Sequence, residues 1–156
     1  MFKKLLLIQR IPVNYDAGLL ALRLFAVTSL FLKHGVEKTI GFRQTYAFMA
    51  TLHLDPIGIG PLPTMLYAAF ADGICTVLMF FGLATRWAAF FSFINIAVAW
   101  AFVHHFEFFG RQADHGELIV LYLAIMLALF LAGAGRYSVD ALLAGKPQTA
   151  NTAGRK

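Results

Sequence analysis

The chain has 156 residues, of which 60% are hydrophobic and only 13% are charged. Soluble domains carry about 25% charged residues, so this chain lacks the polar side chains that a water-exposed surface requires. Disorder is excluded as well, because low hydrophobicity and high net charge are its signature. A compact integral membrane protein is the class that remains. The net charge of +5 would suit a nucleic-acid binder, but the basic residues lie at the ends of apolar runs. We therefore expect a lipid bilayer as the partner and no nucleic acid.

Four apolar segments are long enough to cross a bilayer, which requires roughly 17–25 helical residues. They predict an all-α, integral membrane four-helix bundle that forms one domain over residues 1–144. The small, polar residues 145–156 predict a disordered C-terminal tail. The expected spans are about 17–34, 62–85, 86–104 and 117–135.

The long connection after the first span is expected to contain a short interfacial helix. Thr39–His53 has an aromatic and apolar character that suits a helix lying at the membrane surface. Leu54–Pro63 then reads LDPIGIGPLP, and its repeated proline and glycine residues end any helix. We expect this segment to lie across the mouth of the bundle.

The basic residues predict the orientation of the chain. Four spans place both termini on one side, and the basic residues other than Arg23 divide eight to four in favour of that side. The positive-inside rule then places both termini in the cytoplasm. The eight are Lys3, Lys4, Arg10, Arg86, Arg136, Lys146, Arg155 and Lys156, and the four are Lys33, Lys38, Arg43 and Arg111.

Two charges fall well inside the expected spans, away from the span ends, namely Arg23 in the first and Asp72 in the second. Ionisable residues at such depth are costly and usually face protein or water. Arg23 either extends its charged end to the cytoplasmic headgroups or has a buried partner. Asp72 is too short to reach the surface, so it is neutral, paired or next to water. An Arg23–Asp72 pair would be purely structural, whereas an accessible Asp72 would be a proton or ligand site.

Four histidines gather at the expected outer ends of the spans, together with three acids. Such residues often prefer the polar boundary, but they can also bind a metal, relay protons or hydrogen-bond a quinone. Asn95 lies in mid-span, and if it faces inward the helical wheel favours His105 over His104 as the inward histidine. No pair has the spacing of a metal motif, so no metal ligand is assigned. The group comprises His34, His104, His105, His115, Glu107, Asp114 and Glu117, with His53 nearby in the outer connection.

Several short motifs resemble those of the DoxX family of small bacterial membrane proteins. They are an arginine in the first span (Arg23), HGxxK over His34–Lys38, Asp72–Gly73 in the second span, GLxTR over Gly82–Arg86 and GxGRYSxD over Gly133–Asp140. The resemblance covers roughly residues 17 to 143. One departure is Asp72, because the family more often has the longer glutamate at this position.

The resemblance implies a four-helix membrane bundle in the bacterial inner membrane. It also implies a loose link to quinone-dependent oxidoreduction, because the family is related to DoxD, a subunit associated with quinol oxidase and thiosulfate:quinone oxidoreductase. A quinone is therefore the ligand or cofactor that we consider first. A redox partner subunit and a homo-oligomer are both compatible with the sequence.

Three functions remain open at this point. The first is a quinone- or small-ligand-binding subunit of a redox system, with the ligand inside the bundle. The second is a non-catalytic membrane scaffold or anchor for a partner protein, and the third is copper-type metal handling at the outer face. For the first, the expected catalytic residues are Asp72, His34 and His105, and the expected ligand-binding residues are Arg23, Lys38, Asn95, His104 and Glu117.

Overall fold

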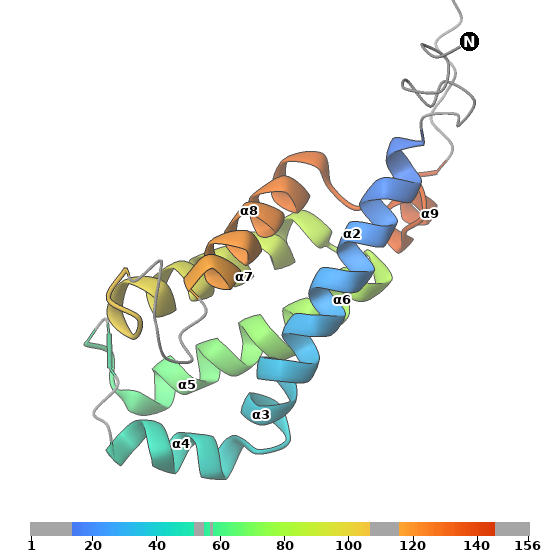
Figure 1. Ribbon diagram of the computed structural model, residues 1–156. Helices are drawn as coiled ribbons and strands as arrows, with labels where there is room; N and C mark the ends of the chain where they lie inside the picture. The colour runs from blue at the N-terminus through green and yellow to red at the C-terminus, as the bar shows by residue number, and fades with distance from the viewer. Residues whose placement is uncertain (1–13, 52–54, 57, 107–115, 146–156) are drawn as a thin grey trace, which may run out of the picture.

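The computed structural model describes residues 14–51, 55–56, 58–106 and 116–145. These residues form helices joined by short loops, with no strand among them, so the predicted all-α membrane fold is confirmed. Figure 1 shows the long helices running side by side, with α4 lying beside one end of α5. The predicted disordered tail lies almost wholly outside the described residues, which end at Gly145.

The first long helix runs from Tyr15 to Thr39 without interruption. It consists of α2 (Tyr15–Leu30), the π-helical turn η1 (Phe31–Gly35) and α3 (Val36–Thr39). The side chain of Asn14 caps its start by accepting a hydrogen bond from the backbone N–H of Ala17 at 3.0 Å. The helix extends beyond the predicted span of 17–34, so Lys38 belongs to it as well as His34.

The predicted helix in the first connection is present as α4 (Phe42–Thr51). It begins later than expected because Thr39 still belongs to α3 and Gly41 lies between the two helices. The interfacial position of α4 stays a prediction. After it, the Asp55 carboxylate accepts hydrogen bonds from the backbone N–H groups of Ile59 at 3.1 Å and Gly60 at 2.8 Å. This anchors the loop just before the second long helix.

The second long helix runs from Pro61 to Phe81. It comprises α5 (Pro61–Ala69), the π-helical turn η2 (Phe70–Ile74) and α6 (Cys75–Phe81). It ends at Gly82, whose left-handed φ of 71° is typical of a residue that terminates a helix. The sequence-based span of 62–85 was therefore too long at its C-terminal end.

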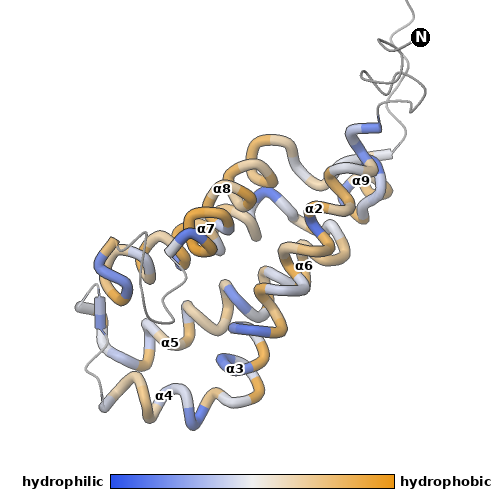
Figure 2. The backbone as a smooth tube through the Cα atoms, viewed as in Figure 1, coloured by the Kyte–Doolittle hydropathy of each residue, from blue (hydrophilic) through white to orange (hydrophobic). Residues whose placement is uncertain are grey.

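Three more helices complete the described structure: α7 (Thr85–Phe102), α8 (Gly116–Ala132) and α9 (Val139–Leu143). Among the described residues, three helices are long and apolar enough to cross a membrane, namely Tyr15–Thr39, Pro61–Phe81 and Thr85–Phe102. The expected fourth span corresponds to α8, which is apolar but has only 17 residues. The four-span count stays a prediction. Figure 2 shows the apolar character of α7 and α8 along most of their length.

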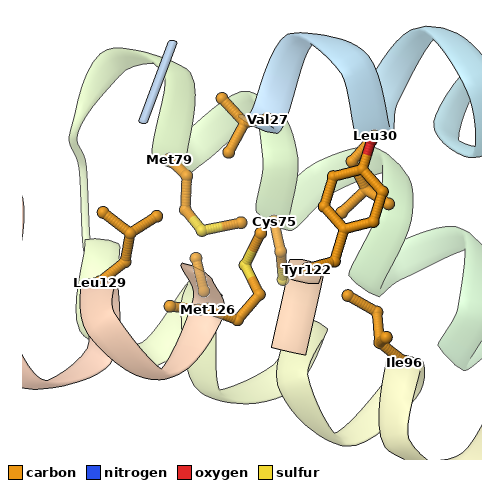
Figure 3. Close-up of a cluster of buried hydrophobic side chains, with 10 residues drawn as sticks. Val27, Leu30, Cys75, Met79, Ile96, Tyr122, Met126 and Leu129 are labelled. Carbon is orange, nitrogen blue, oxygen red and sulfur yellow. The ribbon is translucent and has the colours of Figure 1, made fainter. Parts of the chain in front are cut away.

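The apolar core lies where α2, α6, α7 and α8 meet (Figure 3). Small residues let the helices approach closely, since Ala88 and Ala89 of α7 are both almost completely buried. The methionines Met79 and Met126 fill the space between the helices without measurable exposure. The core cluster comprises Val27, Leu30, Cys75, Met79, Ala88, Ala89, Ile96, Tyr122, Met126 and Leu129.

Candidate ligand-binding site

Asp72 lies in η2 and is only 2% exposed. One of its carboxylate oxygens, Oδ2, accepts a hydrogen bond from the Lys38 ammonium, with which Asp72 forms a salt bridge. The other, Oδ1, accepts a hydrogen bond from Asn95 Nδ2 at 2.9 Å. The side chains of Lys38, Asp72 and Asn95 thus join all three long helices, and we refer to them as the polar triad.

The structure does not contain the Arg23–Asp72 pair that the sequence suggested. That suggestion assumed that Arg23 is the only cation well inside a span. The first helix, however, continues through the π-helical turn as far as Thr39, and so includes Lys38. Lys38 therefore reaches Asp72 from the neighbouring helix. Figure 1 shows α3 beside the junction of α5 and α6.

The two π-helical turns pack against each other at the polar triad, and two glycines permit this. A Cβ added to Gly35 would lie 2.4 Å from the backbone oxygen of Asp72, and one added to Gly73 would lie 2.3 Å from Thr39 Cγ2. Threonine hydroxyls donate to nearby carbonyls, from Thr39 to Gly35 O at 2.6 Å and from Thr76 to Asp72 O at 2.7 Å. Single π-helical turns often mark functional sites. Here the close approach brings Lys38 within reach of Asp72.

A cavity of about 730 Å³ lies beside the polar triad. Its volume falls within the range of roughly 300–1,000 Å³ that is typical of small-molecule sites. Lys38 and Asn95 line it, whereas Asp72 lies behind them. Most of the wall is apolar, with Phe48 and Met49 contributed by α4. The remaining polar or titratable lining residues are His34, Glu37, Thr45, Thr64, Tyr67, His104 and Tyr122.

The structure brings several of the predicted site residues together at this cavity. His34, Lys38, Asn95 and His104 all line it. His105, which was expected to face inward, does not. The helix α7 ends at Phe102, so the helical wheel does not apply to residue 105. His105 has a left-handed φ of 47° and is exposed, so His104 takes the inward position.

Glu117 and Arg23 also lie away from the cavity. Glu117 is exposed in the first turn of α8. Arg23 is only 1% exposed, so it does not extend to the headgroups. Its guanidinium instead donates hydrogen bonds from Nη1 to Ala134 O at 2.6 Å and from Nη2 to Tyr137 O at 2.8 Å. Arg23 therefore holds the loop that follows α8, a structural role at a distance from the cavity.

Two of the sequence motifs meet at this loop and bind each other. The Asp140 carboxylate accepts hydrogen bonds from the backbone N–H groups of Ala84 at 2.7 Å and Thr85 at 3.0 Å, which caps the start of α7. A Cβ on Gly82 would lie 2.7 Å from Arg23 Nη1, so glycine is required there. Asp16 accepts a hydrogen bond from the Arg136 N–H at 2.8 Å. We call this assembly, Arg23 with Gly82–Thr85 and Ala134–Asp140, the closed end.

The outer cluster of histidines and acids is only partly described. Of its members, His53, Glu107, Asp114 and His115 lie outside the described residues. Within the described ranges, no group of three or more histidine, cysteine, aspartate or glutamate side chains could hold a metal ion.

Two tyrosines of the cavity were not anticipated. Tyr67 donates a hydrogen bond to Phe91 O at 3.0 Å, and the Tyr122 hydroxyl lies 2.7 Å from Ser29 Oγ. A buried tyrosine hydroxyl usually needs a hydrogen-bond partner. That general rule was the only indication in the sequence that these tyrosines take part in polar contacts. The direction in which each ring points depends on helix packing, and no motif encodes it.

Comparison with known proteins decides the family. The family model described as DoxX matches residues 18–105, more than half of the chain. The chain belongs to the DoxX family. A protein of Haemophilus influenzae, described as an uncharacterized protein, is 30% identical over 130 residues, which cover 81% of this DoxX chain and 92% of the relative. A second one from the same organism, described in the same words, is 29% identical over 132 residues, covering 84% and 86%. No solved structure matches the chain.

Proposed function

We propose that this DoxX protein binds a quinone, or a small apolar ligand of similar shape, in the cavity beside the polar triad. The observation that carries the proposal is the cavity itself, about 730 Å³ in volume, with an apolar wall and with Lys38, Asn95 and His34 on its surface. A few polar groups in a largely apolar pocket are typical of sites that bind and orient a small molecule.

The lining residues suit the chemistry of a quinone. Its ring and tail are lipid-soluble and can contact side chains such as Phe48, Phe91 and Ile119. Its carbonyl oxygens accept hydrogen bonds, which the Lys38 ammonium and the Asn95 amide can donate. Of the residues expected from the sequence, His34, Lys38, Asn95 and His104 remain in the proposed site, and Asp72 lies behind them.

In this proposal the protein is a subunit of a redox system in the bacterial inner membrane, with both termini cytoplasmic. The cavity then lies towards the outer face, because it is lined by α4 and by the ends of α3 and α7 that are remote from the closed end. Electrons would be exchanged between the bound quinone and a partner subunit.

Ligand-dependent stability of the purified protein in detergent tests this proposal. A benzoquinone with a short alkyl chain should raise the unfolding temperature, because a ligand at about 100 times its Kd stabilises the folded state by roughly 2.7 kcal/mol. Ala99→Trp, which fills the cavity, should abolish the increase. Ala21→Trp is the matched control, since Ala21 is exposed on α2 and should leave the increase unchanged. An unfolding temperature that no quinone alters would overturn the proposal.

A further inference from the structure

The two charged residues of the polar triad differ in their access to the cavity. The side chain of Lys38 is 20% exposed and lines the cavity, whereas that of Asp72 is 3% exposed. Both carboxylate oxygens of Asp72 are occupied, one by Lys38 and the other by Asn95. A ligand in the cavity therefore meets the ammonium and the amide before it can meet the carboxylate.

The hydrogen-bonding capacity that remains on this surface favours an acceptor. A lysine ammonium has three N–H donors, of which Lys38 uses one on Asp72. An asparagine amide has two, of which Asn95 uses one on the same carboxylate. Tyr67 already donates its hydroxyl proton to Phe91 O. A ligand with a carbonyl oxygen at its polar end can thus be bound by charge-assisted and neutral hydrogen bonds.

The charges around the cavity favour a neutral ligand. The positive charge of Lys38 is compensated by Asp72, and Glu37 also lines the cavity. An anion would add a negative charge to a largely apolar space in which Lys38, the one lysine among the described lining residues, is already paired. A cation would find no available buried carboxylate, because both oxygens of Asp72 are occupied and the Glu37 carboxylate is exposed, where solvent and salt screen its charge. The other titratable side chains that face the cavity are those of His34, His104, Tyr67 and Tyr122.

We infer that the cavity selects a neutral ring compound with a carbonyl acceptor, that Lys38 contacts this carbonyl, and that Asp72 is a positioning residue. This inference rests on the proposed function and assigns roles within it. Asp72 holds the ammonium in place and compensates its charge, so it determines which ligands bind without touching them.

Three probes with the same alkyl chain test the inference on the purified full chain, namely an alkylbenzoquinone, an alkyl carboxylate and an alkylamine. Wild-type protein should bind the benzoquinone in preference to the other two. Asp72→Asn should weaken benzoquinone binding and strengthen carboxylate binding, each by roughly tenfold, because the ammonium is then neither held nor compensated. A change of preference is a result that a merely structural role would not produce.

The double variant Lys38→Met with Asp72→Asn protects the test against misfolding, because it leaves no buried charge without a partner. It should fold, as judged by circular dichroism and gel filtration. It should bind the benzoquinone about tenfold or more weakly and gain no affinity for the carboxylate. Asp16→Asn is the matched control, since Asp16 contacts the closed end through the backbone N–H of Arg136 and does not line the cavity. This variant should leave all three affinities unchanged.

Each outcome bears on a separate part of the inference. Benzoquinone binding that the double variant retains would overturn the contact with Lys38 and leave the proposed function standing. A wild-type preference for the carboxylate or the amine would overturn the selection of neutral ligands. An unchanged preference in Asp72→Asn would overturn the positioning role. Failure of wild-type protein to bind any quinone would instead refute the proposed function.

Discussion

At the scale of single residues, Arg23 and Asp72 show what the position of a charge in the sequence can predict and what it cannot. The sequence identified both as costly charges within spans, and both are indeed almost completely buried. Their partners could not be predicted, because these lie far along the chain, at Ala134 and Tyr137 for Arg23 and at Lys38 for Asp72. Backbone carbonyls as partners for an arginine leave no trace in the side-chain pattern.

The role of Arg23 leads to a prediction that separates stability from binding. Arg23→Lys keeps the charge but loses the planar group that bonds two carbonyls at once, so we expect a lower unfolding temperature and a loss of about 1–3 kcal/mol. Quinone affinity of the folded protein should not change, because the closed end does not line the cavity. Thermal unfolding and ligand titration measure the two effects.

Arg136→Lys is the control for this variant, since the Arg136 side chain is exposed and the hydrogen bond to Asp16 is donated by the Arg136 backbone N–H. It should alter neither quantity. Weaker quinone binding in folded Arg23→Lys protein would contradict a purely structural role for Arg23.

At the scale of helices, existence and type followed from hydropathy, while ends and irregularities did not. The helix expected in the first connection is present as α4, and the apolar segments are helices. The π-helical turns η1 and η2 could not be predicted, because their sequences, FLKHG and FADGI, have no pattern that distinguishes them from α-helix. The helical wheel favours His105 over His104 as the inward histidine, but α7 ends at Phe102, two residues before the predicted end of the span, and His104 lines the cavity instead.

The contact between the two π-helical turns predicts a strong effect of two small substitutions. Gly35→Ala should push η1 away from η2, and Gly73→Ala should push η2 away from α3, because the added Cβ would lie 2.4 Å from Asp72 O and 2.3 Å from Thr39 Cγ2, respectively. Such overpacking costs roughly 1–3 kcal/mol, and we expect a lower unfolding temperature together with weaker quinone binding.

Gly18→Ala provides the matched control, since Gly18 lies in α2 with nothing within 4 Å of an added Cβ. Alanine is the better helix former, so this variant should be equally or slightly more stable, by at most about 1 kcal/mol. Equal stability for all three alanine variants would show that the two turns do not pack as tightly as described.

At the scale of the whole molecule, one end of the bundle holds the helices together and the other end contains the cavity. The closed end uses the GLATR and GAGRYSVD segments to bind the last described helices to the first, and the cavity lies at the other end. Between them lies the apolar core around Cys75, Met79 and Met126, each at most 1% exposed. The family motifs thus predicted the all-α membrane fold, whereas the residues of the candidate site come from all three long helices and required their packing to be known.

This division predicts which side of the membrane each end faces, and cysteine labelling in intact cells can measure it. Cys75 is the only cysteine of the chain and is buried, so a membrane-impermeant maleimide should not react with it in the folded protein. In a Cys75→Ala background, Val103→Cys at the cavity should react from outside, and added quinone should slow the reaction. Ala144→Cys, exposed after α9, should react only when the cells are opened. Reaction of Ala144→Cys in intact cells would reverse the orientation inferred from the basic residues, whereas quinone that fails to protect Val103→Cys would contradict binding in the cavity.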